Sequence, residues 1–356
     1  MPGAGTKTDI TTSNPAPESL WLRLKRAFKA RWYRRQLMWR AFRKRRELTL
    51  LKDCTAQIQR SDILLFSTVR NERQRLPYFL THHRALGVDQ FLMVDNGSDD
   101  GTVEYLLDQP DVSLWQTKHS YKDSRFGVDW LNWLQTRYGT GHWCLVLDAD
   151  ELLIYPQHDT KDLNQLTAWL DENGQKRLRT VMLELYPKGP PSQQRHMPGQ
   201  HPAEVLQWFD ADGFVPLDQP GLRNEVLTGG PRLRMFFQDS PRKAPTLSKM
   251  PLIKWHWRYA YVSSTHSLLP RDLNHPSGAP EDAVTGVLLH SKFLPDIVDR
   301  SADEKQRAQH FAYSDQYGDY YDSLIEDPDF WHEKAHKYQD WQQLVHLGLM
   351  RGKNWG

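Results

Sequence analysis

The sequence has little cysteine and no long apolar run. Only Cys54 and Cys144 occur among its 356 residues, which excludes a disulfide-stapled scaffold and favours a reducing compartment. No cluster of Cys and His has the spacing of a zinc site. No stretch reaches the roughly eighteen apolar residues of a transmembrane helix, and the N-terminal residues lack the apolar core of a signal peptide. We therefore expect a cytoplasmic location.

Acidic residues follow directly after an apolar run in the middle of the chain. Residues 143–147, Trp-Cys-Leu-Val-Leu, lead into Asp148-Ala149-Asp150-Glu151. A short apolar run of this kind predicts a buried strand, which would deliver the carboxylates to the carboxyl edge of a sheet. Open α/β sheets bind ligands at that edge, and a D-x-D pair there can hold a hard divalent cation. Taken alone, the tetrapeptide is also compatible with an ordinary solvated turn.

Two further strands are predicted upstream, and both end in polar residues. Residues 63–66 lead into the polar segment 67–72, and residues 91–94 lead into the segment 95–102. Between them Leu76, Phe79, Leu80 and His83 recur at helical spacing. This alternation of strand and helix predicts an α/β fold with a Rossmann-type mixed sheet flanked by helices. The three strand ends would meet at one edge of that sheet.

These three strand ends resemble the glycosyltransferase family 2 group, which has the GT-A fold, and especially its bacterial members with an aspartate-rich D-x-D-E. The matching pieces are Thr68-Val69-Arg70-Asn71-Glu72, Val94-Asp95-Asn96-Gly97-Ser98-Asp99-Asp100-Gly101-Thr102 and Leu147-Asp148-Ala149-Asp150-Glu151. The resemblance is specific over residues 62–156 and looser beyond them. It implies a GT-A-like fold and transfer of a sugar from a nucleotide-sugar donor, with UDP as the expected nucleotide.

The resemblance also implies roles for single residues. Those expected around the nucleotide are Thr68, Arg70, Asn71, Glu72, Asp95 and Gly97. Asp148 and Asp150 would hold Mn²⁺ or Mg²⁺ on the diphosphate, and His290 would complete the metal site, although a structural histidine is the competing interpretation. Oxygen ligands suit these two ions better than zinc, and a bound ion would make the diphosphate a better leaving group. Lys292 would reach the same diphosphate.

No motif identifies the general base. Inverting members of the family use a carboxylate to deprotonate the acceptor hydroxyl, but their usual downstream acidic motif has no clear match here. The candidates are Glu225 and His266. The Glu281-Asp282 pair is a further option in a Pro/Gly loop, where solvent exposure is expected. Inversion is therefore expected from the resemblance alone.

Two segments of the second half have alternative interpretations. Residues 187–202 are rich in proline and predict a loop, either a boundary or a lid over the site. Residues 227–234 combine two glycines with Arg232 and Arg234, which indicates either contact with phosphate or acceptor, or a plain turn.

The segment from Leu20 to Arg46 is strongly basic. It contains twelve Lys or Arg and no Asp or Glu, in a chain whose formal net charge is +2. Trp21, Leu24, Phe28 and Trp32 recur in it at helical spacing. A basic amphipathic helix of this kind can lie on anionic lipid, or it can pack its aromatic residues on the catalytic domain. Nucleic acid is not the expected partner.

The predicted organisation has four parts. Residues 1–56 form a disordered tail and the basic helix, residues 57–190 a nucleotide-sugar-binding half, residues 191–300 an acceptor-side half, and residues 301–356 a C-terminal helical segment. The expected activity is metal-dependent transfer of a sugar to an envelope or capsule glycan or a lipid-linked acceptor, at the inner face of the membrane if the basic helix binds lipid. The alternatives are a noncatalytic glycan- or lipid-binding protein and a nucleotidyltransferase.

Overall fold

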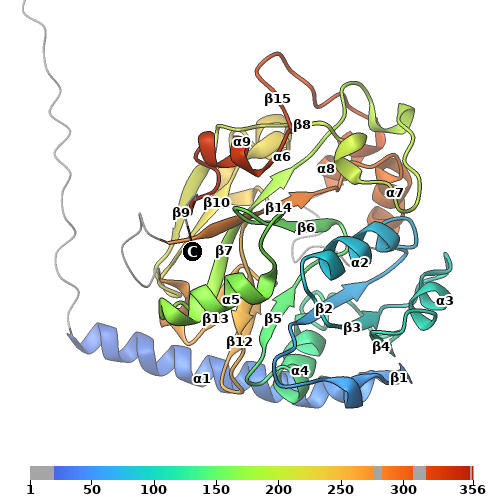
Figure 1. Cartoon of the computed structure of the whole chain (residues 1–356). Coiled ribbons are helices and arrows are strands. Elements are labelled where there is room, and N and C mark those ends of the chain that lie inside the picture. Colours follow the sequence, from blue (N-terminus) through green and yellow to red (C-terminus); the bar gives the residue numbers. More distant parts are fainter. Residues whose placement is uncertain (1–19, 276–282, 308–317, 353–354, 356) are drawn as a thin grey trace, which may run out of the picture.

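A mixed β-sheet with helices on both faces forms the centre of the molecule (Figure 1). The computed structural model describes residues 20–275, 283–307, 318–352 and 355. The predicted fold class is confirmed: a large mixed sheet, flanking helices and a basic N-terminal helix. The predicted tail and the Glu281-Asp282 pair lie outside the described residues.

The central sheet has nine strands in the order β1-β4-β3-β2-β5-β11-β7-β14-β6. In chain order they are β1 (Thr49–Lys52), β2 (Leu64–Val69), β3 (Gln90–Asp95), β4 (Val112–Gln116), β5 (Trp143–Val146), β6 (Glu151–Ile154), β7 (Arg177–Glu184), β11 (Ser248–Lys254) and β14 (Thr285–His290). Strands β4, β3, β2 and β5 are parallel neighbours. Strand β11 runs antiparallel to β5 and β7, whereas β14 is parallel to β7 and antiparallel to β6.

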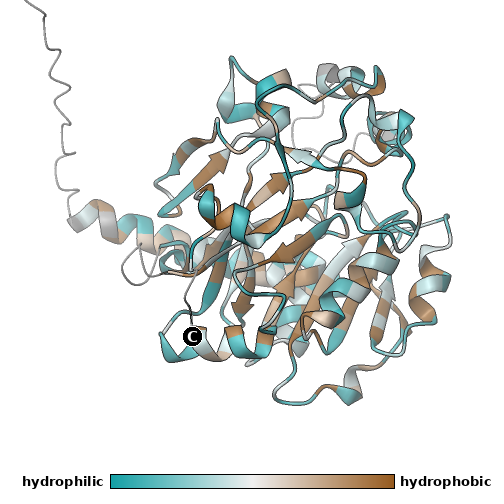
Figure 2. Ribbon diagram, turned by 45° about the horizontal axis from the view of Figure 1, so that its top comes forward, coloured by the Kyte–Doolittle hydropathy of each residue, from teal (hydrophilic) through white to brown (hydrophobic). Residues whose placement is uncertain are grey.

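The inner strands β2, β3 and β5 are apolar on both faces because both faces are covered. Leu65 and Met93 pack into one core, and Leu64 and Leu92, their neighbours in sequence, pack into the other. Figure 2 shows this as brown strands between helices of mixed polarity. The apolar runs that predicted the strands are therefore the consequence of burial on two sides.

Nine helices flank the sheet or extend from it in the described part of the chain. They are α1 (Leu20–Lys44), α2 (Leu76–Ala85), α3 (Thr102–Leu107), α4 (Val128–Tyr138), α5 (Leu163–Glu172), α6 (Gly230–Phe236), α7 (Ile297–Arg307), α8 (Gly318–Ile325) and α9 (Trp341–His346). Residues of α2, α3, α5 and α9 fill the core on one face. On the other face lie α4 and the hairpin of β12 (Ala260–Ser263) and β13 (Ser267–Leu269).

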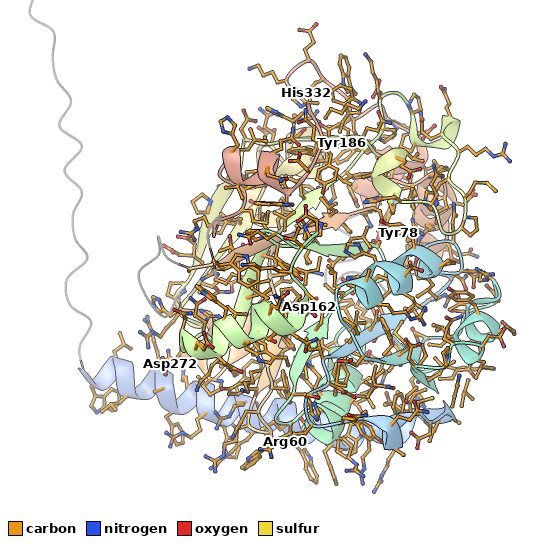
Figure 3. All side chains as sticks on the ribbon, viewed as in Figure 1. Arg60, Tyr78, Asp162, Tyr186, Asp272 and His332 are labelled. Atoms are coloured by element: carbon orange, nitrogen blue, oxygen red, sulfur yellow. The ribbon has the colours of Figure 1, made fainter. Side chains whose placement is uncertain are left out.

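Local sequence signals account for the flanking helices. The four residues of α2 that predicted its apolar face, Leu76, Phe79, Leu80 and His83, are all buried. Helix α5 begins with a capping box, in which the Asp162 side chain (labelled in Figure 3) accepts from the Gln165 N–H and the Gln165 side chain accepts from the Asp162 N–H. A cap of this kind satisfies two helix-end donors and so determines where the helix starts.

Helix α1 packs along α4 by one face. Leu37 and Ala41 are buried, Leu37 in a cluster with the β12–β13 hairpin, and Arg40 makes an ion pair of 3.0 Å with the buried Asp129 of α4. The Trp130 indole N–H donates to Glu47 just after the helix, at 2.9 Å. No helix in the described part of the chain is long and apolar enough to cross a membrane.

A smaller cluster joins the end of β7 to the C-terminal part of the chain. The carboxylate of Asp210 accepts from the Tyr186 hydroxyl and pairs with Arg234 (3.0 Å) and His332 (3.0 Å). Figure 3 labels Tyr186 and His332 in this region. Strand β8 (Trp208–Phe209) pairs with β15 (His336–Lys337), and β9 (Val215–Gln219) pairs with β10 (Asn224–Thr228).

Candidate functional site

The three predicted polar strand ends do meet at one edge of the sheet. Val69 of β2 pairs in register with Asp95 of β3, and Phe66 of β2 pairs with Val146 of β5. The strands are parallel, so the residues that follow them emerge on the same side. The expectation that the segments 68–72, 95–100 and 148–151 share an edge is confirmed.

The acidic segment forms a turn between two strands. Strand β5 ends at Val146, and β6 begins at Glu151, whose side chain is fully buried. Strand β14 pairs antiparallel with β6 and places His290 directly opposite Glu151. The Ser291 N–H then donates to the Asp150 carbonyl at 2.7 Å. A pairing between segments about 140 residues apart in the sequence thus brings the histidine to the acids.

His290 contacts carboxylates through both ring nitrogens. Its Nε2 lies 3.1 Å from Asp150 Oδ2, and its Nδ1 lies 3.5 Å from Glu184 Oε1. Burial lowers the pKa of His290, but the two carboxylates outweigh it and leave that pKa above its usual value. Burial raises the pKa of Asp150, but His290 and Arg75 outweigh it and hold that pKa well below the usual range. The contact between the two groups therefore favours the imidazolium–carboxylate form of the pair.

Lys249 of β11 supplies a second cation. Its Nζ lies 2.8 Å from Asp148 Oδ2 and also contacts Glu151 Oε1. The Lys249 side chain is 4% exposed, whereas the Asp148 side chain is 51% exposed. Burial raises the pKa of Glu151 to about 7, against the opposing effect of Lys249. The charge of the acidic turn is thus partly neutralised by the protein itself.

A third ion pair, between Glu184 and Arg232, lies next to the Nδ1 side of the His290 ring. Glu184, at the end of β7, is fully buried and pairs with Arg232 of α6. Burial raises the pKa of Glu184, but Arg232 and His290 outweigh it and lower that pKa to about 2. The carboxylate is therefore ionised and holds the His290 ring in place.

The acid cluster has the donor chemistry of a divalent-cation site. Asp150, Glu151 and His290 each offer one ligand atom, and these atoms lie within 4.8 Å of one another. Carboxylate and imidazole groups are both ligands of divalent metal ions in proteins. Of the three predicted ligands, Asp150 and His290 lie together, whereas Asp148 pairs with Lys249. Glu151 was not expected in this set, although the apolar run that follows it, residues 152–155, marks the start of a second strand.

Arg70, which follows β2, and Lys292, which follows β14, are half-buried cations, and neither makes an ion pair within the described residues. Burial, with Arg232 next, lowers the pKa of Lys292 to about 8, while Asp150 raises it. The charge of Asp150 therefore acts on Lys292, and in the described part of the chain the ammonium group of Lys292 makes no ion pair.

A small pocket lies beside Asp148 and Lys249. It is lined by Thr68, Tyr121, Phe126, Val128, Leu131, Val146, Leu147, Asp148, Lys249, Tyr261, Ser264 and Thr265; we call it the Thr68 pocket. The hydroxyls of Thr68 and Thr265 are buried, and neither has a hydrogen-bond partner among the residues that the structure describes. Buried polar groups are normally satisfied, so these two hydroxyls are available to a ligand in the pocket.

The other residues expected around the nucleotide contact the protein itself. Asn71 exchanges hydrogen bonds with Asp99, at 2.9 and 3.0 Å. The Asp95 carboxylate is buried and accepts from the Gly97 N–H at 3.1 Å. Glu72 is buried between Arg75 and Arg300, at 3.3 and 2.6 Å. These contacts shape the loops at the sheet edge, whereas the side chains of Thr68 and Arg70 make no such contact within the described residues.

The two candidate bases lie in different places. Glu225 is exposed on β10, and its carbonyl accepts from Arg179, which precedes Glu184 by five residues in β7. That separation is about 17 Å along the strand, so the structure does not bring Glu225 to the acid cluster. His266 Nδ1 donates to the Ser248 carbonyl at 2.7 Å. Burial, with the neighbouring Lys249 next, lowers the pKa of His266 to about 4.

The glycine- and arginine-containing segment 227–234 is not a plain turn. It carries the end of β10 into α6, and Arg232 is buried against Glu184. Lys249 was not assigned a role from the sequence. Its signal in the sequence is its position directly before the apolar run 250–253, in a strand that is buried.

Comparisons with known proteins add little to this geometry. No family model matches the chain, and no curated protein matches it. Among solved structures, it is similar to the crystal structure of 4-diphosphocytidyl-2C-methyl-D-erythritol synthase, with 16% identity and a TM-score of 0.24. That match covers 39% of this chain and 66% of the other, slightly less than two thirds of its length. A likeness this low carries no conclusion about function.

Proposed function

We propose that this protein is a metal-dependent glycosyltransferase that takes a sugar from a nucleotide-sugar donor, with UDP as the expected nucleotide. The observation that carries the proposal is the convergence of the Thr68 pocket, the acidic turn and His290 at one carboxyl edge of a parallel sheet segment. Ligands of open α/β sheets bind at such an edge.

Each part has a chemical task. Asp150, Glu151 and His290 would hold Mn²⁺ or Mg²⁺, which supplies Lewis-acid charge for the departing diphosphate. Lys292, a cation without an ion pair, would contact the same diphosphate. Thr68 and Arg70 would contact the nucleotide. Of the two candidate bases, His266 lies beside Lys249 of the site and Glu225 does not, so His266 is the one to test first.

The acceptor is proposed as an envelope or capsule glycan or a lipid-linked sugar, and the reaction as inverting. The division into a nucleotide-binding half, residues 57–190, and an acceptor-side half, residues 191–300, is part of the same proposal. So is a cytoplasmic location at the inner face of the membrane.

A donor screen tests the proposal. The full-length protein is incubated with individual nucleotide sugars, with and without Mn²⁺, and free nucleoside diphosphate is measured. We expect Mn²⁺-dependent release from one donor, and loss of it in Asp150→Asn. His290→Ala should weaken Mn²⁺ binding by about tenfold or more. Asp212→Asn, a change at an exposed acid outside the site, should leave the release unchanged.

Two outcomes would contradict the proposal. Full turnover of Asp150→Asn in the presence of a chelator would show that the reaction does not need a metal ion. Release of pyrophosphate from a nucleoside triphosphate, with no release of diphosphate from any nucleotide sugar, would identify a nucleotidyltransferase instead.

A further inference from the structure

The face of α1 that points away from the protein is apolar and aromatic. The helix is already docked by its opposite face, where Leu37 is 1% exposed. On the outward face Trp21, Phe28 and Trp32 are 72%, 70% and 56% exposed. We call the set Trp21, Leu24, Phe28, Trp32 and Trp39 the aromatic stripe. Packing on the protein therefore does not account for these residues.

Helix geometry places the stripe on one side. Its members are separated by three, four, four and seven residues, which are near-whole turns of an α-helix. Leu37 lies about 160° around the helix from Trp39, because each residue advances the helix by about 100°. One face of α1 thus packs on the protein, and the opposite face carries the exposed aromatic stripe.

Basic residues border the stripe on both sides. At about 100° per residue, the exposed Arg31 and Arg35 lie along one border, and the exposed Lys25, Lys29 and Arg43 lie along the other. The segment from Leu20 to Arg46 contains no acid. A helix with an aromatic face bordered by Lys and Arg is suited to lie in the plane of an anionic lipid surface.

We propose that α1 is an interfacial helix that inserts the aromatic stripe into the surface of an anionic bilayer. Lipid fits better than the alternatives. A nucleic acid would engage the charges but leave large apolar side chains without a partner. A second copy of the helix, paired symmetrically, would bring two acid-free basic segments together at a cost from like-charge repulsion.

Membrane docking would also bring the candidate site near the bilayer. Helix α1 contacts α4 and the β12–β13 hairpin, and Figure 1 shows it along the edge of the molecule beside α4 and β12. The Thr68 pocket is lined in part by Val128 of α4 and Tyr261 of β12. The same elements therefore support the helix and form a wall of the pocket. The docking itself does not depend on the proposed activity.

Vesicle sedimentation of the full chain tests the inference. Phosphatidylcholine vesicles with phosphatidylglycerol are compared with pure phosphatidylcholine vesicles at low and high salt. We expect binding to the acidic vesicles that weakens as salt rises. Phe28→Glu/Trp32→Glu should reduce binding to them by about tenfold or more. The control Leu107→Glu/Met197→Glu makes the same charge change at exposed apolar residues outside α1 and should bind like the unmodified chain.

Thermal melts accompany the assay, since the stripe residues are exposed and their replacement should not lower the melting temperature. If it does, Arg31→Glu/Arg35→Glu tests the basic border instead, with the same expected loss. Equal binding of stripe and control variants to acidic vesicles would overturn the inference. So would stripe-dependent self-association, or binding to RNA or DNA, in the absence of vesicle binding.

Discussion

At the scale of single residues, the distinctive feature of the site is a lysine buried among carboxylates. Lys249 pairs with Asp148 and Glu151, and Asp150 carries a third carboxylate in the same turn. Removing one partner of a buried pair leaves an uncompensated charge, which is more costly than losing an exposed pair. Lys249 therefore stabilises the acidic turn in the absence of a metal.

We expect Lys249→Met to lower the free energy of unfolding by about 3–5 kcal/mol near neutral pH and above. The pKa of Glu151 is raised to about 7 with Lys249 present, and it should rise further without it. A carboxyl whose folded pKa is raised contributes stability at low pH and loses it as pH rises through that value. The loss should therefore be smaller at about pH 6 than at about pH 8, as measured by denaturant titration.

Lys254→Met is the matched control, because Lys254 lies on the same strand and pairs with Asp171 at the surface. It should cost less than about 1 kcal/mol and show no such pH dependence. Added Mn²⁺ should stabilise Lys249→Met more than the unmodified chain, since ligand binding to the folded state raises stability. If Mn²⁺ stabilised both proteins equally, the Lys249 ammonium group would not compete with the ion for the carboxylate of Glu151.

At the scale of elements, the start of α4 determines the shape of the Thr68 pocket. Helix α4 begins after Gly127, which has a φ of +78°. A Cβ at this position would lie 2.7 Å from Thr68 Oγ1. The first turn of the helix and the end of β2 therefore approach closely because residue 127 has no side chain.

Gly127→Ala should lower both stability and activity. The left-handed conformation costs a non-glycine residue about 1–2 kcal/mol, and the new methyl group must displace Thr68 from the pocket wall. Gly141→Ala separates these effects, because Gly141 has a φ of +94° and nothing within 4 Å of its Cβ position. Unfolding titrations should show a smaller loss for Gly141→Ala, and donor turnover should fall only in Gly127→Ala. Unchanged turnover in Gly127→Ala would show that donor turnover does not depend on the position of Thr68.

At the scale of the whole molecule, the central sheet interleaves strands from distant parts of the chain. Strand β11 lies between β5 and β7, and β14 lies between β7 and β6. Two strands of the proposed acceptor-side half thus complete the sheet of the nucleotide-binding half. Without the residues of the other half, the edges of β5, β6 and β7 that pair with β11 and β14 would have no partner strand.

We expect the fragment of residues 57–190 to lack cooperative unfolding, since it leaves the edges of β5, β6 and β7 unpaired. Far-ultraviolet circular dichroism and a urea titration of this fragment, beside the full chain, measure the difference. The full chain should unfold with coincident fluorescence and circular-dichroism transitions. A cooperative transition of the isolated fragment would show that β11 and β14 are dispensable for its fold.

Much of the first half of the fold was predictable because its signals are local. Burial on both faces makes strands such as β5 continuous apolar runs, and the spacing of Leu76, Phe79 and His83 follows from a helix covering one face. Parallel strands joined by short helices bring their carboxyl ends together, so the shared edge of Thr68, Asp95 and Asp150 followed from alternation alone. The basic helix was likewise predictable from charge and spacing.

Tertiary pairing decided the rest of the site. Lys249 reaches Asp148 because β11 pairs between β5 and β7, and Glu184 reaches His290 because β7 and β14 are parallel neighbours. The direction of the aromatic stripe on α1 depends on which face docks on α4. These relations join segments far apart in the chain, and no period or spacing of a single sequence encodes which distant strand or helix is the partner. The sequence by itself determined much of the first half of the fold and the acidic edge; the structure alone determined which charges meet there, because those contacts depend on pairing between distant segments.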